Sequence, residues 1–320
     1  MKPPATIEYG HGITCIDTFH QRAGLACCYL MVERGRCALI DTGTRNSVEM
    51  IERVMANKGL RPEDMDFIIP THVHLDHAGG AGELMRRMPK ARLVVHPRGA
   101  RHMIDPSRLR AGAVAVYGEE VFKRDYGQLT PIAAERVIEA PDGHRESLAG
   151  RTLTFLDTPG HANHHFCVWD QRSRGFFTGD TFGLSYRAFD TDQGAFVMPT
   201  TTPVQFNPEA WRHSLDRMMT YEPQRMFLTH FGQVTDVRRM AEDLRAGIDA
   251  MVEIARKNDR DGLEHRTQAI AADVRAYFMD GLDKHGVLLG GKDRLALLAM
   301  DIELNAMGLD VWLDRRKTGS

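Results

Sequence analysis

Short apolar runs separated by turn residues dominate the first hundred positions of this chain. Three of them cover residues 13–16, 26–32 and 37–40, and Gly35 lies in the polar stretch between the last two. Further apolar runs at 66–69 and 92–96 have the length and composition of buried strands. This pattern predicts strands joined by hairpins at the start of the chain, followed by strands that alternate with helices.

Helical periodicity appears first at residues 47–57, where Val48, Ile51, Val54 and Met55 share one face and Gly59 follows as a stop signal. After Gly232 the helical pattern takes over. An apolar stripe at spacings of three and four runs through 237–255, and two more helices are expected at 265–282 and 293–307. We therefore predict a strand-rich domain over residues 1–235 and a helical extension over residues 236–320.

Residues 97–130 interrupt the alternation with a long connection of mixed apolar and basic character. Long inserted connections often form binding walls or lids, which is one interpretation here. A packing or dimer element is the other. The helical extension has the same open alternatives, because it either packs on the core, forms an oligomer interface or shapes a substrate entrance.

The densest chemistry lies at residues 70–80, where four metal-binding side chains occupy six positions: His72, His74, Asp76 and His77. Imidazole and carboxylate groups bind zinc, iron and manganese. If extended geometry continues past the strand at 66–69, His72, His74 and Asp76 point the same way and His77 diverges towards a second ion. Gly79 and Gly80 would then allow a helix to begin beside the metals. The pattern predicts a metal site.

Composition limits the classes of binding partner that we expect for this chain. The 320 residues hold 41 Lys+Arg and 43 Asp+Glu, a formal net charge of −2, so bulk electrostatics favours neither nucleic acid nor an anionic membrane. The five cysteines form no Cys-x-x-Cys pair, and no signal peptide or membrane span is evident. We expect a cytoplasmic protein that acts on a small-molecule substrate, with a homo-oligomer possible.

The stretch 71–77, Thr-His-Val-His-Leu-Asp-His, resembles the His-x-His-x-Asp-His signature of the metallo-β-lactamase-fold superfamily. Four other segments resemble further family motifs in the right order, and each follows an apolar run: 38–43, 158–161, 176–181 and 226–232. The resemblance covers about residues 10–235. It implies a four-layer αβ/βα sandwich of the α/β (α+β) class, with the helical extension at its C-terminus.

The resemblance also implies a ligand set for two divalent ions, zinc first, with iron or manganese as alternatives. His72, His74 and His161 would hold one ion, Asp76, His77 and His230 the other, and Asp180 would bridge them. Two ions held this way give a hydroxide nucleophile at neutral pH, and Asp76 would orient it as the catalytic carboxylate.

Three further residues are candidates for supporting roles. Asp41 is interpreted either as a partner of a ligand histidine or as a turn former before Gly43. His165 follows His161 closely and is expected to support the site rather than to bind metal. Tyr186 is a candidate pocket residue, although lactonases of the superfamily carry their tyrosine three residues after the bridging aspartate, where this chain has Gly183.

These features predict an enzyme, a metal-dependent hydrolase that cleaves a small ester, lactone or thioester with a hydroxide bound by two metals. Asp180 replaces the cysteine of class B1 and B2 β-lactamases, which disfavours antibiotic hydrolysis. The alternative is a mononuclear iron oxygenase resembling persulfide dioxygenases, with His72, His161 and Asp180 as its facial triad. A non-catalytic protein that kept the fold is the weakest hypothesis, since none of the seven ligands is missing.

Overall fold

The computed structural model describes residues 5–260 and 265–318. The chain divides into two compact units. The first unit comprises Met1–Asp157, His164–Gly179 and Gln224–Gln233. The second comprises Thr158–Asn163, Asp180–Pro223 and Val234–Ser320. The predicted boundary at residue 235 stays a prediction.

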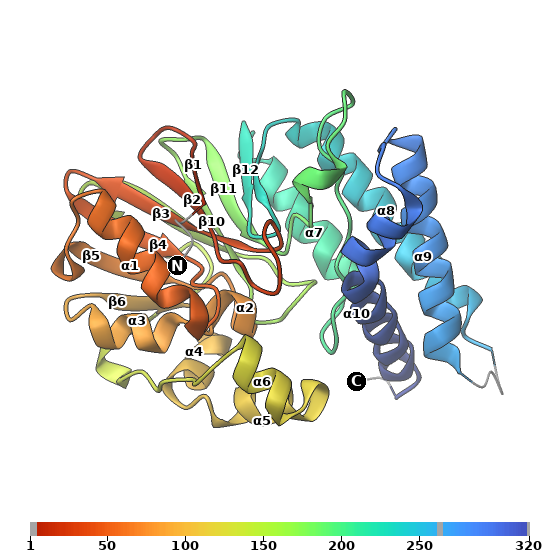
Figure 1. Cartoon of the computed structure of the whole chain (residues 1–320), viewed down its shortest axis with the longest axis horizontal. Helices are drawn as coiled ribbons and strands as arrows, with labels where there is room; N and C mark the ends of the chain where they lie inside the picture. Colours follow the sequence, from red (N-terminus) through yellow and green to blue (C-terminus); the bar gives the residue numbers. More distant parts are fainter. Residues whose placement is uncertain (1–4, 261–264, 319–320) are drawn as a thin grey trace. The chain divides into compact units, whose positions relative to one another are not determined.

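A seven-stranded sheet begins the first unit, with the spatial order β1-β2-β3-β4-β5-β6-β7 equal to the chain order (Figure 1). Strands β1 to β4 form an antiparallel meander, and β4 to β7 pair in parallel. The bounds are Thr6–Glu8, Ile13–Asp17, Cys27–Glu33, Arg36–Ile40, Met65–Ile69, Arg92–Val95 and Val137–Glu139. Because β5 and β6 are parallel, the chain leaves the sheet at one edge after Ile69 and after Val95.

The second sheet has six strands in the order β13-β12-β11-β10-β9-β8. Strands β8 to β11 pair antiparallel, and β11 pairs with β12 in parallel. From β8 to β13 the bounds are Arg145–Leu148, Arg151–Asp157, Phe166–Asp170, Gly175–Gly179, Arg225–Leu228 and Gly232–Val234. Strands β9, β11 and β12 run in the same direction, so the chain leaves this sheet at one edge after Asp157, Gly179 and Leu228.

The two sheets face each other across an apolar layer. Tyr29 of β3, Phe177 of β11 and Phe227 of β12 lie at its centre, and the Phe177 and Phe227 rings stack at 4.7 Å. The other face of the first sheet is covered by α1 (Val48–Asn57), α3 (Ala81–Arg87) and α4 (Pro97–Ile104), as Figure 1 shows. Burial of this much apolar surface is the main stabilising contribution in the unit.

The connection at 97–130 is helical for most of its length. After α4 it forms α5 (Ser107–Tyr117) and α6 (Glu119–Asp125). Phe122 and Tyr126 are buried against Leu75, which belongs to the short helix α2 (Leu75–Ala78) within the histidine-rich motif. The connection is therefore anchored on the segment that carries the metal-binding side chains.

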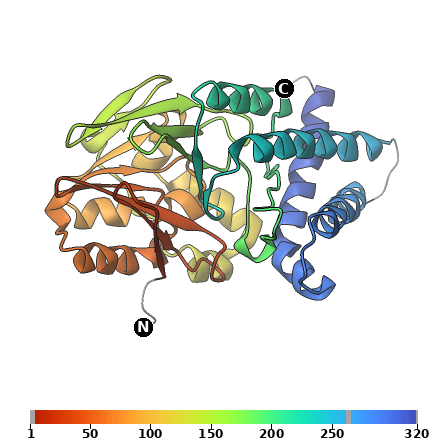
Figure 2. The ribbon, with the colours of Figure 1, turned by 90° about the horizontal axis from the view of Figure 1, so that it is seen from above.

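Helices make up most of the second unit: α7 (Pro208–Met219), α8 (Val237–Lys257), α9 (Arg266–Lys284) and α10 (Gly291–Thr318). Helices α8, α9 and α10 pack against one another (Figure 1, Figure 2). The apolar stripe predicted for 237–255 is buried along α8. Short 3-10 turns occupy Arg45–Ser47, Pro62–Asp64, Ala134–Arg136 and Arg187–Phe189.

Helix α10 extends beyond its predicted end at residue 307, because Gly308 does not act as a stop signal. A Cβ atom at Gly308 would lie 1.5 Å from the carbonyl oxygen of Thr201, so glycine is required here for close packing. Leu309 and Leu313 remain buried beyond it. The last helical turns are rich in Arg and Lys, and Arg315 there donates a hydrogen bond to the Val204 carbonyl oxygen.

The structure confirms the predicted mixed α/β class, with two sheets, helices and a helical C-terminal part. Across residues 5–260 and 265–318, no helix is both long enough and apolar enough to cross a bilayer.

Candidate metal centre

The histidine-rich motif changes from strand to helix within a few residues. Strand β5 ends at Ile69, and His74 has extended backbone angles at the N-cap of α2, so the helix begins at Leu75. The expectation that extended geometry carries His72, His74 and Asp76 to one side is therefore wrong for Asp76. Because Asp76 lies in the first helical turn, it is directed towards His77 and His230 instead. Helix α2 begins before Gly79 and Gly80, and α3 begins at Ala81, directly after them, as the glycine pair predicts.

Asp76, His77 and His230 form a triangle of ligand atoms in the first unit. Their separations are 3.3 Å from His77 Nε2 to His230 Nε2, 3.3 Å from His230 Nε2 to Asp76 Oδ2 and 3.6 Å from His77 Nε2 to Asp76 Oδ2. Three ligands of a tetrahedral zinc ion, each about 2.1 Å from the metal, would be separated by about 3.4 Å. The triangle has the size that a divalent ion requires.

The hydrogen bonds on the far side of these imidazoles determine which nitrogen faces the triangle. His230 Nδ1 lies 2.8 Å from the Leu25 carbonyl oxygen, which only accepts, so Nδ1 carries the proton. His77 Nδ1 lies 3.0 Å from Asp41 Oδ2 and donates to that carboxylate. In the neutral rings, both Nε2 atoms therefore direct lone pairs at each other over 3.3 Å. Such an arrangement is unfavourable without a shared cation, so this donor set fits a divalent metal ion.

Asp41 is the shared acceptor of several hydrogen bonds behind the triangle. It is fully buried, with a left-handed φ of 54°, and it accepts from the Thr71 backbone N–H at 2.7 Å and from the hydroxyls of Thr71 and Thr229. With His77, the carboxylate therefore has donors from three residues on two separate chain segments. Asp41 is thus a hydrogen-bond partner of the ligand candidate His77.

His72 and His74 make a second close pair in the same unit. His72 Nε2 lies 2.8 Å from His74 Nδ1. The Thr71 hydroxyl donates to Asp41, so it can accept from His72 Nδ1 at 3.2 Å, which leaves the Nε2 lone pair of His72 directed at His74. The His165 ring stacks on His72 at 4.9 Å, which agrees with a supporting position for His165.

Gly179 shows how closely this support is packed. Its φ is +48°, and a Cβ atom there would lie 2.5 Å from His165 Nε2 and 2.5 Å from the Thr71 hydroxyl oxygen. Any other residue would displace these two side chains, both of which contact His72. His164, the neighbour of His165, lies with its ring 5.7 Å from His74 and 6.2 Å from His72.

In the second unit, His161 and Asp180 form a pair of their own. His161 Nε2 lies 3.3 Å from Asp180 Oδ2, and His161 Nδ1 donates to the Thr200 carbonyl oxygen at 3.0 Å. The Nε2 lone pair of His161 therefore faces a carboxylate oxygen, an arrangement that a cation again would stabilise. Both residues directly follow strands of the second sheet, Asp180 immediately after β11 and His161 four residues after the end of β9.

Tyr186 has a different environment from the one predicted for a pocket residue. Its side chain is buried, and its hydroxyl donates to the Asp301 carboxylate of α10 at 3.0 Å and 3.1 Å. This bond ties the segment after Asp180 to the last helix of the same unit.

Sequence reasoning did not identify the two threonines that hold Asp41. A signal was present, because Thr71 and Thr229 each directly precede a ligand candidate, His72 and His230. The hydroxyls of both threonines, each at the end of a strand, donate to one buried carboxylate.

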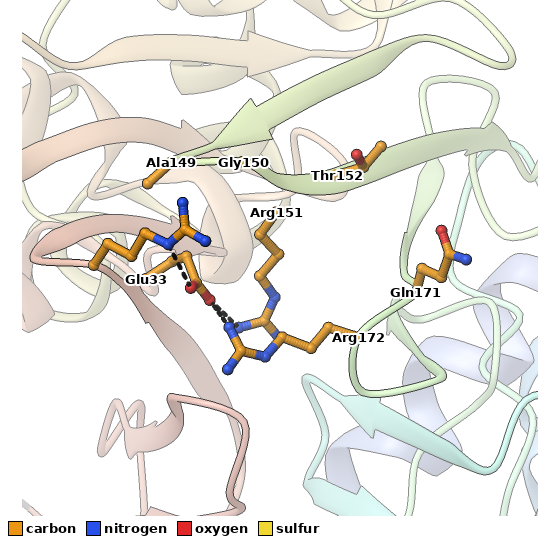
Figure 3. A pocket seen from close by; sticks show the side chains of 8 residues that line it. Glu33, Ala149, Gly150, Arg151, Thr152, Gln171 and Arg172 are labelled. Carbon is orange, nitrogen blue, oxygen red and sulfur yellow. Dashed lines mark hydrogen bonds and ion pairs between the residues drawn. The ribbon is translucent and has the colours of Figure 1, made fainter.

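A separate hollow of about 340 Å³ lies at the opposite ends of the strands, between the β3–β4, β8–β9 and β10–β11 turns (Figure 3). Arg151 is buried there and bonds both oxygens of Asp170, and Arg34 and Arg172 both contact Glu33. Because each guanidinium group already has a carboxylate partner, we interpret this hollow as a structural ion-pair network.

Comparison with known proteins extends these observations. The sequence profile of the metallo-β-lactamase superfamily matches residues 23–230. The metallo-beta-lactamase fold-containing protein ST1585 of Sulfurisphaera tokodaii is 27% identical over 215 residues, which are 66% of this chain and 74% of that protein. Its crystal structure superposes with a TM-score of 0.65 at 23% identity, covering 94% of this chain and 98% of that one.

A fungal relative has a more specific name. The atrochrysone carboxyl ACP thioesterase of Aspergillus fumigatus is 28% identical over 154 residues, 48% of this chain and 38% of that enzyme. The chain thus spans about three quarters of the archaeal relative and well under half of the fungal one.

Proposed function

Because the chain belongs to the metallo-β-lactamase superfamily, whose members are mostly enzymes, we propose that it is a metal-dependent hydrolase of a small ester, lactone or thioester. The triangle of Asp76, His77 and His230 carries this proposal. Its hydrogen bonds orient two imidazole lone pairs towards the position of a cation, and its dimensions match first-row coordination.

We propose that two divalent ions bind in all, with zinc as the first choice and iron or manganese as alternatives. The second ion would be held by His72, His74 and His161, and Asp180 would contact both ions. Two pairs of these ligand candidates already have their ligand atoms close together. The separation is 2.8 Å in the His72–His74 pair and 3.3 Å in the His161–Asp180 pair. When bound, such ions lower the pKa of a water molecule and act as Lewis acids towards a carbonyl oxygen.

The roles of the protein groups follow from their exposure. The Asp76 side chain is 26% exposed, against 7% for His230 and none for His77, so Asp76 is the member of the triangle most accessible to water and substrate. We propose that Asp76 orients the attacking water and takes up its proton. Asp41 holds His77 in one tautomer, as its hydrogen bond requires.

The substrate class rests on two supports. An ester, lactone or thioester presents the single carbonyl oxygen that a Lewis acid can polarise. The fungal relative that is 28% identical is named a thioesterase, which places thioesters first in the panel. A small-molecule substrate also agrees with the formal charge of −2.

Metal content and activity measured on one preparation test this proposal. We expect about two ions per chain and hydrolysis of at least one ester, lactone or thioester. His77→Ala should lose one ion and the activity, whereas His213→Ala, which alters an exposed histidine of α7, should lose neither.

The same measurements separate the oxygenase alternative. One iron per chain, with oxygen uptake on glutathione persulfide and no hydrolysis, would establish that activity instead. Metal-loaded protein that hydrolyses no member of the panel would refute the hydrolase proposal.

A further inference from the structure

The loop between β2 and β3 carries a histidine that no sequence pattern singled out. His20 is 6% exposed, and its ring contacts that of Tyr126 at a centroid distance of 5.5 Å. Within residues 5–260 and 265–318, neither ring nitrogen of His20 has a hydrogen-bond partner. Although most of the residue is buried, its ring nitrogens are not among the fully buried polar atoms that lack a partner, so they can still reach a bound ligand.

The backbone around His20 holds the side chain in place at a conformational cost. Phe19 and Gln21, on either side of it, have left-handed φ values of 50° and 56°. Asp17 fixes the loop by accepting from the backbone N–H groups of Phe19 and Gly24, each at 2.8 Å. Non-glycine residues in this region cost about 1–3 kcal/mol each and persist where the surroundings enforce them, often at functional sites.

Two contacts place this loop beside the triangle of Asp76, His77 and His230. At its C-terminal end, the Leu25 carbonyl oxygen accepts the Nδ1–H of His230. On the other side, Tyr126, the ring partner of His20, packs with Phe122 on Leu75, the immediate neighbour of Asp76. His20 thus lies between the segments that deliver His230 and Asp76.

Electrostatics agrees with this position. Burial lowers the pKa of His20, which favours the neutral imidazole. A neutral imidazole offers one N–H donor and one acceptor nitrogen.

We propose that His20 is a substrate-binding residue whose ring N–H donates a hydrogen bond to a carbonyl or carboxylate oxygen of the acyl group. This inference rests on the proposed function, because it takes an acyl compound as the ligand. The β2–β3 loop and Tyr126 would hold that donor beside Asp76, His77 and His230.

His20→Phe and His20→Gln, in the zinc-loaded full-length chain, test the proposal. Phenylalanine keeps a ring against Tyr126 and removes the donor, while glutamine restores an N–H. The readouts are zinc per chain, calorimetric binding of butyrate, and the kcat and KM for S-butyryl-N-acetylcysteamine. His213→Phe on the exposed face of α7 is the matched control.

We expect His20→Phe to keep its zinc and to raise both the butyrate Kd and the KM about tenfold, the loss of one hydrogen bond. His20→Gln should recover most of this loss. Loss of zinc in His20→Phe would overturn the proposal, since it would make His20 part of the metal centre. Unchanged Kd and KM, or a wild-type protein that does not bind butyrate, would also overturn it.

The binding arm keeps the two proposals separable. Wild-type protein that binds butyrate but hydrolyses no substrate would refute the hydrolase, while weaker butyrate binding by His20→Phe would still support the role of His20.

Discussion

Asp41 and His77 face each other across 3.0 Å, and both side chains are inaccessible to solvent. Because Asp41 also accepts from Thr71 and Thr229, one buried carboxylate orients a ligand candidate and contacts the two residues that precede other ligand candidates. The edge of the first unit that carries these ligand candidates is therefore organised around Asp41.

Asp41→Asn should weaken metal binding without changing the volume of the side chain. The amide nitrogen of asparagine cannot accept the hydrogen bonds that the carboxylate now accepts. His77 would then no longer be held in a single tautomer. We expect zinc affinity to fall about 10- to 100-fold, as measured by competition with a chelating dye. Asp66→Asn, at a partly exposed residue paired with Arg36, is the control. Equal affinities in both variants would contradict the role assigned to Asp41.

His230→Ala should remove one ion and leave the other. The substitution deletes a corner of the triangle, whereas the His72–His74 pair is separate from it. Elemental analysis should fall from about two ions to about one per chain, and activity should fall roughly 10²- to 10³-fold or more. A variant that retains both ions would show that His230 is no ligand.

Gly308→Ala should be strongly destabilising, although alanine is normally the better helix former. The added Cβ would lie 1.5 Å from the Thr201 carbonyl oxygen, so α10 must shift, at a cost of about 3 kcal/mol or more. Gly112→Ala in α5 meets open space and should instead stabilise by up to about 1 kcal/mol. Urea unfolding of the two variants measures the difference. A neutral Gly308→Ala would refute the close approach.

Glu83 should make folding stability depend on pH below about 4.5. The hydrogen bond from Arg86, with that from Arg87 and the charge of Arg45, lowers the pKa of Glu83 to about 2. Its contribution is therefore complete above the unfolded-state pKa of about 4.3 and is lost as the pH falls towards 2.

Urea unfolding of metal-free protein at pH 6 and pH 3 measures this contribution. The wild type should lose about 1–3 kcal/mol more than Glu83→Gln over that interval. Metal-free samples are used at both pH values because the release of bound ions at low pH would otherwise change the stability as well. Parallel pH profiles for the two proteins would contradict the prediction.

Local signals account for what the sequence predicted correctly. The apolar runs that became β5, β9, β11 and β12 are contiguous, and the candidate ligands follow each of them within a few residues. The grouping of Asp76 with His77 and His230 came from the family resemblance, and the structure brings these three together.

Tertiary contacts account for what the sequence did not predict. Asp76 changes direction because α2 begins early, and Leu75 of that helix is packed under Phe122 and Tyr126, about fifty residues away. Tyr186 binds Asp301, which is 115 residues distant, and Gly308 continues a helix because Thr201 packs against it. No local pattern encodes such pairings.

The separation of His77 and His230 by 153 positions has a consequence for biosynthesis. During translation, Asp76 and His77, two of the three residues of the triangle, are added to the nascent chain long before His230. Fragments that end before residue 230 lack that corner, so the complete triangle can assemble only after the ribosome has added His230.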